Sequence, residues 1–192
     1  VRLDISASPF GVSVSGPARV EQLGPGVTRI VADSGDVAVG LEHNEAIYGL
    51  TERIVDSRLK SELWPAEVGG LDRRGERVTM WVKPTIAAYV PFYVSSRGYG
   101  LLVEGTRPGW FDIGKAEPDT LRIGWDRGGE ELSIVVFHGP GYFEVLDRYT
   151  EHAGRPFLPP RWAFLPWKWR GECKSGNFAE VGFNKLASGL PL

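Results

Sequence analysis

The chain has 192 residues, of which 42% are hydrophobic and 24% are charged, and its formal net charge is −2. These values are typical of a folded globular protein and exclude a disordered segment. Charges of both signs are scattered, so we expect no nucleic-acid partner and no membrane partner, and no apolar run approaches the roughly 20 residues that span a bilayer. The lone cysteine, Cys173, cannot form an internal disulfide. It permits a reducing compartment, and we expect a soluble protein with the cytoplasm as the favoured location.

Short strands are predicted along the first two thirds of the chain. Apolar residues alternate with polar ones in many short runs, and the 25 glycines and 14 prolines supply turns between them. The strand candidates are residues 1–5, 12–14, 27–31, 37–41, 77–82, 110–114, 120–125 and 131–139. Residues 88–105 predict a hairpin that turns at Ser96-Arg97-Gly98, with Pro91 at an edge or a bulge. Nothing repeats at a fixed period, so the pattern predicts a β-sandwich.

One helix is predicted at about residues 141–153. The positions i, i+3, i+4 and i+7 of an apolar stripe are occupied by Tyr142, Val145, Leu146 and Tyr149. Gly154 suits the position just after the last turn, and Pro156 prevents the helix from continuing.

The segment after this helix has a different character. Prolines make "RPFLPPRW" (155–162) extended, and "WAFLPWKW" (162–169) is apolar almost throughout, which predicts a strand buried on both faces. We therefore place a sandwich at 1–140, a helix and proline-rich connector at 141–160, and the start of a second body at 161–192.

The usual signatures of metal, cofactor and nucleophile chemistry are missing. The three histidines have no liganding spacing, one cysteine builds no zinc site, and no phosphate-cradling loop or nucleophile elbow occurs, so we expect no metal and no cofactor. Carboxylates such as Glu52, Glu104 and Asp112 lie on different predicted strands, and the sequence does not place them relative to each other. A turn, cap or ion pair is the favoured role for each, rather than paired acid–base chemistry.

The seven tryptophans suit either of two roles. They can stack on sugar rings or anchor the core of a sandwich, and the core role is favoured for any single one. The exception is "PWKWR" (166–170), because the end of a barrel strand is where a barrel places its chemistry.

Three motifs together resemble glycoside hydrolase family 31, which holds α-glucosidases and α-xylosidases. They are "IYGLTER" (47–53), "VPFYVSSRGYGLLVEG" (90–105) followed by "WFDIG", and "LDRYTEHAGRPFLPPRWAF" (146–164). The chain departs from the family pattern at Thr51, where glycine is usual, and at Ala153, where threonine is usual. The resemblance implies a mainly β fold, a galactose-mutarotase-like β-sandwich with one C-terminal helix leading into the start of a truncated (β/α)8 barrel.

The resemblance also implies a function. Such enzymes are retaining α-glycosidases, in which one carboxylate attacks the sugar and a second one protonates the leaving oxygen and then activates water. The family carries both aspartates on later barrel strands, so neither has a counterpart here, and we expect the chain to be inactive alone. The implied partners are an α-linked oligosaccharide or glycoside and the missing catalytic barrel.

Substrate contacts are the remaining role. In this family a loop of the N-terminal sandwich reaches over the barrel mouth, and its counterpart carries Trp81, Lys83 and Thr85. The end of the first barrel strand offers Trp169 as an aromatic wall and Arg170 as a hydrogen-bond donor to a sugar hydroxyl or an acidic substituent, although a structural ion pair explains Arg170 as well.

Two other interpretations remain open. The chain is alternatively a free-standing carbohydrate-binding β-sandwich module without catalysis, or a scaffolding domain whose sugar contacts are incidental. The apolar strand appended after the helix argues against an autonomous module.

Overall fold

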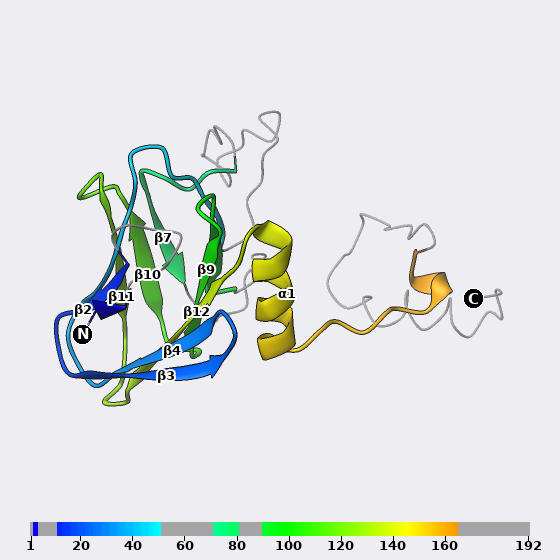
Figure 1. Ribbon diagram of the computed structural model, residues 1–192, viewed down its shortest axis with the longest axis horizontal. Helices are drawn as coiled ribbons and strands as arrows, with labels where there is room; N and C mark the ends of the chain where they lie inside the picture. Colours follow the sequence, from blue (N-terminus) through cyan, green and yellow to red (C-terminus); the bar gives the residue numbers. More distant parts are fainter. Residues whose placement is uncertain (1, 4–10, 51–70, 81–89, 165–192) are drawn as a thin grey trace, which may run out of the picture. The chain divides into compact units, whose positions relative to one another are not determined.

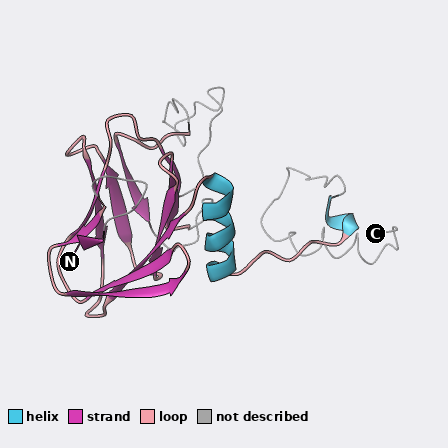
Figure 2. Cartoon of the chain, viewed as in Figure 1, coloured by secondary structure: helices cyan, strands magenta, loops and turns pink. Residues whose placement is uncertain are grey.

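The computed structural model describes residues 2–3, 11–50, 71–80 and 90–164. The chain divides into two compact units, Val1–Gly154 and Arg155–Leu192. The first unit is an antiparallel β-sandwich with a single described helix beside it (Figures 1 and 2). The predicted mainly β fold is therefore confirmed.

The described strands form two antiparallel sheets of six strands each. Sheet A has the order β1 (Arg2–Leu3), β2 (Val12–Val14), β5 (Val37–Gly40), β11 (Thr120–Trp125), β10 (Gly109–Ile113) and β7 (Glu76–Met80). Sheet B has the order β3 (Ala18–Gly24), β4 (Val27–Ala32), β12 (Leu132–His138), β9 (Tyr99–Glu104), β8 (Phe92–Ser95) and β6 (Ile47–Gly49).

The main core lies between the two sheets. Alternating strands point every second residue inward, so Val37 and Val39 of β5 face Ile30 of β4 and Ile134 of β12, and all four are buried. Tyr93 and Phe111 meet edge to face at 6.0 Å between ring centroids. The alternation seen in the sequence thus encodes the inner faces of both sheets.

Sheet B is also covered on its outer face, by helix α1 (Tyr142–Ala153). Tyr149 stacks on Phe92 with ring centroids 3.8 Å apart and meets Phe137 edge to face at 5.9 Å. Val145 is buried between the helix and the sheet. Because both faces are covered, β8 and β12 are apolar almost throughout instead of alternating.

Most predicted elements are confirmed. The hairpin of β8 and β9 turns at residues 96–98, and α1 matches the predicted helix to within one residue at its start. Pro91 lies just before β8, where its carbonyl accepts a hydrogen bond from the Val103 amide at 2.9 Å. Two strands were not predicted: β3, whose side chains are mostly exposed, and the short β6.

The apolar stripe of α1 is only partly packed: Val145 is buried, while Tyr142 and Leu146 stay exposed. One sequence-based expectation is wrong. The strand predicted from Trp162 does not begin there: Arg161–Phe164 form a 3-10 turn, in which the Ala163 amide donates to the Pro160 carbonyl at 2.9 Å. The consecutive prolines before it favour this turn, and the rest of the predicted strand lies outside the described residues.

Candidate functional site

All five residues predicted to contact substrate lie outside the described residues. Trp81, Lys83 and Thr85 fall within 81–89, and Trp169 and Arg170 fall within 165–192. Their roles stay predictions. The site described below is one that the sequence did not predict.

The described carboxylates among the candidates have structural partners. Glu104 of β9 forms an ion pair with Arg29, with Nε and Oε2 3.3 Å apart, and accepts a hydrogen bond from Ser133 Oγ at 2.5 Å. Asp112 of β10 is buried, and its Oδ1 accepts the backbone amides of Lys115 and Ala116 at 3.0 Å each. These are the ion-pair and turn roles that the sequence favoured, while Glu52 lies outside the described residues.

An apolar groove opens between the start of α1 and the edge of sheet B. Its volume is about 610 Å³. It is lined by Tyr48, Gly49, Leu50, Val90, Phe92, Val94, Tyr142 and Leu146. Tyr48 and Tyr142 meet edge to face across it, with ring centroids 6.3 Å apart. Partial burial raises the pKa of Tyr142, and the nearby Tyr48 hydroxyl raises it further by a smaller amount. The groove therefore has an aromatic, uncharged lining.

The edge strand β6 is held in place by a buried carboxylate just before it. Glu45 Oε1 accepts hydrogen bonds from Ser95 Oγ at 2.5 Å and from Tyr99 OH at 2.7 Å, and Oε2 accepts the Glu42 amide at 2.9 Å. Burial raises the pKa of Glu45, and the two hydroxyl donors act in the opposite direction. The strand that supplies one wall of the groove is thereby fixed to the β8–β9 hairpin.

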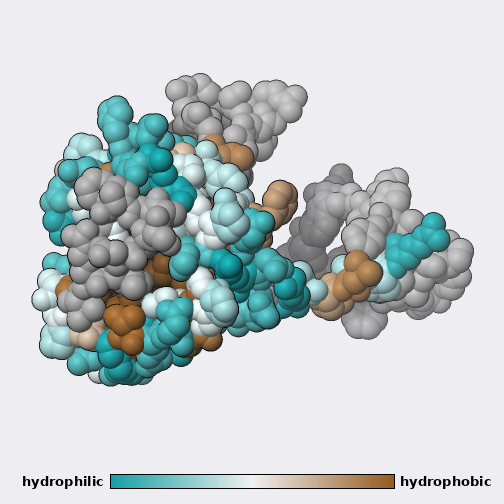
Figure 3. Space-filling view, in the orientation of Figure 1, coloured by the Kyte–Doolittle hydropathy of each residue, from teal (hydrophilic) through white to brown (hydrophobic). Residues whose placement is uncertain are grey.

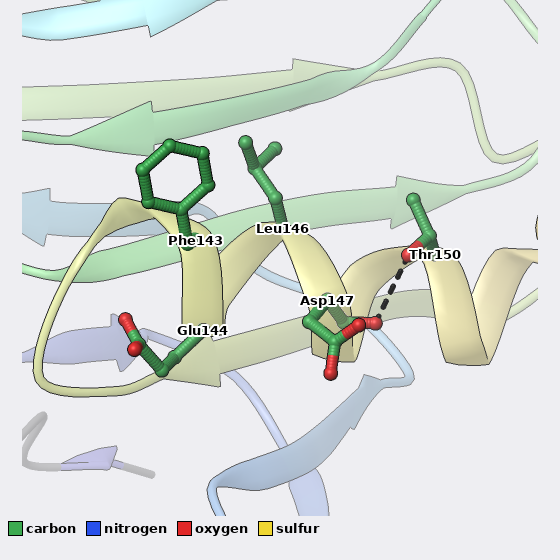
Figure 4. Close-up of a pocket in the computed structure, with 5 residues that line it drawn as sticks. All are labelled: Phe143, Glu144, Leu146, Asp147 and Thr150. Carbon is green, nitrogen blue, oxygen red and sulfur yellow. Dashed lines mark hydrogen bonds between the residues drawn. The ribbon is translucent and has the colours of Figure 1, made fainter.

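Helix α1 presents an apolar ridge next to the groove. Figure 4 shows Phe143 and Leu146 projecting side by side from the helix, while Glu144 and Asp147 project from its other side. Phe143 is 84% exposed, an unusual exposure for a phenyl ring. By contrast, the face seen in Figure 3 is mainly hydrophilic over α1 and carries its hydrophobic residues in small separate groups.

A second, smaller hollow on α1 adjoins this ridge. It has a volume of about 450 Å³ and is lined by Phe143, Glu144, Leu146, Asp147 and Thr150. Thr150 Oγ1 donates to the Asp147 carbonyl at 3.0 Å (Figure 4). Leu146 lines both this hollow and the groove. We call the groove together with Phe143 and Leu146 the α1 face.

The described residues hold no metal site. No group of three or more His, Cys, Asp or Glu side chains among them is arranged to bind an ion. Within the same residues, no helix is long and apolar enough to cross a membrane. Among the described residues, the α1 face gathers exposed apolar side chains beside a groove, which suits contact with another surface.

The fold and the α1 face define a β-sandwich domain with an apolar surface for contact. No family model matches the chain. It is 34% identical over 130 residues to the α-xylosidase XylQ of Lactiplantibacillus pentosus, covering 65% of this chain and 15% of that enzyme. It is 32% identical over 138 residues to an α-xylosidase of Emericella nidulans, covering 69% of this chain and 15% of that enzyme.

Solved structures share the fold. A dextranase of glycoside hydrolase family 31 from Flavobacterium johnsoniae, complexed with glucose, aligns with a TM-score of 0.52 and 21% identity over 71% of this chain and 18% of that one. The chain is thus related to the family 31 glycoside hydrolases and corresponds to the N-terminal part of those enzymes. It spans 15% of the length of both α-xylosidases.

Proposed function

We propose that this chain is the N-terminal sandwich of a retaining α-glycosidase acting on α-glucosides or α-xylosides, and that a catalytic (β/α)8 barrel covers its α1 face. The observation that supports this most is the exposed apolar ridge on the helix that leads out of the sandwich. In the α-xylosidases, most of the sequence has no counterpart in this chain. In this proposal, residues 161–192 begin the barrel.

Neither the acidic pair on α1 nor Glu104 suits glycoside hydrolysis. A retaining enzyme needs two carboxyl groups about 5 Å apart across a sugar, one of them with its pKa raised by an apolar pocket. Glu144 and Asp147 lie one helical turn apart, but both are exposed. Glu104 is bound by Arg29 and Ser133. We therefore assign catalysis to the barrel and a supporting role to the sandwich.

Hydrolysis assays test the first part of this proposal. The 192-residue chain is expected to release no nitrophenol above background from aryl α-glucosides or α-xylosides, with the L. pentosus α-xylosidase as the positive control. Turnover that disappears in Glu104→Gln or Glu144→Gln would place the reaction in the sandwich and refute the assignment.

A chimera tests the docking part. This chain replaces the matching segment of the L. pentosus α-xylosidase, and aryl α-xyloside hydrolysis is measured for soluble protein only. Phe143→Asp with Leu146→Asp is expected to abolish the activity of the chimera, since two charges would be buried in an apolar contact. Leu23→Asp, on the exposed strand β3, is the control. Equal activity in both variants would remove the α1 face from the proposal.

A further inference from the structure

Within the described residues, the outer face of sheet A carries the indole of Trp110 opposite two small residues. Trp110 of β10 pairs with Gly124 of β11 on one side and with Thr79 of β7 on the other. A Cβ atom on Gly124 would lie 2.2 Å from the indole, so the ring lies across the strand where any other residue would put its side chain. The ring is partly exposed. A nearly flat aromatic surface results.

Arginines flank this indole. The guanidinium carbon of Arg77 lies 3.9 Å from the centroid of the Trp110 ring, and within the described part of the chain Arg77 has no carboxylate partner. Two residues further along β10, Asp112 lies opposite Arg77 of β7 and Arg122 of β11 in the backbone register. Arg122 is bound by Glu117 at 2.7 Å. The Arg77 guanidinium therefore lies over the ring, where it can donate to a ligand beside the indole, whereas that of Arg122 is already paired with Glu117.

The charges along this row decide the class of ligand. The formal charges of Arg77 and Arg122 equal those of the neighbouring Asp112 and Glu117 in number, although the ion pair in this row is that of Arg122 with Glu117. An anionic ligand gains little where the formal charges cancel. A neutral sugar fits better, because its C–H face stacks on an indole while its hydroxyls accept from guanidinium groups. The contact of Arg77 with the ring is weak at an exposed position, so a ligand can displace it.

We propose that Trp110, Arg77 and Thr79 form a surface site for a neutral oligosaccharide, separate from the α1 face. The idea rests on the proposed function, since a surface site of this kind keeps a glycan chain near the enzyme that cleaves it. Thr79 contributes a hydroxyl beside the ring, and Gly124 keeps the ring flat.

Binding of neutral oligosaccharides to the 192-residue chain tests the site. Maltoheptaose and isomaltoheptaose are titrated while backbone amide resonances and tryptophan fluorescence are followed. The expected result is weak binding with shifts at residues 77–79, 110 and 124. Trp110→Ala is expected to weaken it by roughly tenfold or more, since the stacking surface is lost. Leu23→Ala removes an exposed apolar side chain on β3, in the other sheet, and is expected to leave affinity unchanged.

Gly124→Ala gives an independent check that keeps the indole. Its Cβ must push the ring off the strand, so affinity is expected to fall while the fold, followed by amide spectra, is retained. The site is refuted if the wild-type chain binds neither sugar at millimolar concentration, if Trp110→Ala binds normally, or if Leu23→Ala is the variant that loses binding. Failure here leaves the chimera assay unaffected, so the two proposals fail separately.

Discussion

Among single residues, the turn that leaves β6 holds two unusual backbone conformations. Gly49 has φ of 112° and the following Leu50 has φ of 66°, although Leu50 is buried. A left-handed conformation costs a residue with a side chain about 1–2 kcal/mol. The Leu50 amide donates to the Phe92 carbonyl at 2.8 Å, which ties this turn to β8. The turn thus shapes one wall of the groove at the expense of some stability.

Replacement of Gly49 by alanine is expected to destabilise the fold. A Cβ there would lie 2.8 Å from the Phe92 carbonyl oxygen and would also strain the backbone. Together these effects are expected to cost about 2–4 kcal/mol of unfolding free energy. Urea denaturation monitored by tryptophan fluorescence gives the value.

Substitutions at two other glycines distinguish the cost of a steric clash from the cost of backbone strain. Gly75 has φ of 82° but open space around its Cβ position, so Gly75→Ala is expected to show strain alone, about 1–2 kcal/mol. Gly24 has open space and no positive φ, so Gly24→Ala is expected to be close to neutral. If Gly49→Ala costs no more than Gly75→Ala, the contact with β8 has no energetic importance.

At the level of elements, a polar cluster fixes the C-terminal end of α1 to sheet B. His152 Nε2 lies 2.8 Å from Glu104 Oε1, and Arg29 and Ser133 contact the same carboxylate. Partial burial alone would raise the pKa of Glu104, but the hydrogen bonds from Ser133 and His152 and the charge of Arg29 together hold it below its usual value. The cluster thus stabilises the packing of α1 against sheet B when Glu104 is ionised.

Acidification is expected to weaken this contact between α1 and sheet B. A carboxyl with a lowered folded pKa contributes stability above its unfolded pKa, about 4.3, and loses it as the pH falls through the folded value. Glu104→Gln removes this contribution, so its unfolding free energy is expected to fall less than that of the wild type between pH 7 and pH 3. Glu130→Gln, at an exposed loop position, is the control. Parallel pH curves for wild type and Glu104→Gln would contradict the role of the cluster.

The predictability of each element follows from where its side chains lie. The strands with an alternating pattern and the helix are recovered from the sequence because their apolar periods match burial between layers. Strand β3 was missed because it is an edge strand with mostly exposed side chains, and β6 was missed because only Ile47 of its three residues is buried, so it shows no alternation. The apolar stripe on α1 includes Leu146, which is 40% exposed, because the period alone cannot say which body covers a residue. For the same reason the α1 face could not be predicted.

For the molecule as a whole, the motifs predicted the family relationship better than they predicted the site. "IYGLTER" supplies β6 and the strained turn, and the 90–105 motif supplies the β8–β9 hairpin, so both have clear structural reasons. The substrate contacts assigned to Trp81 and Trp169 stay predictions, since both lie outside the described residues. Family motifs here report how the sandwich is built, while sugar contacts depend on loops that vary more in length and sequence.

An uncovered α1 face should make the isolated chain associate with itself. Its aromatic groove and the 84% exposed Phe143 offer apolar area that water solvates poorly, so we expect concentration-dependent dimers or larger species at tens of micromolar, about −6 kcal/mol of association free energy. Sedimentation velocity across a concentration series measures this directly.

A matched pair of leucines shows whether the α1 face is responsible. Leu146 on α1 and Leu23 on β3 are each 40% exposed, so replacement by aspartate adds the same charge at the same exposure. Leu146→Asp is expected to keep the chain monomeric, because the charge would be buried in the contact, whereas Leu23→Asp should associate like the wild type. If both variants associate equally, the contact lies elsewhere, and the apolar ridge of α1 loses its assigned role as a docking surface.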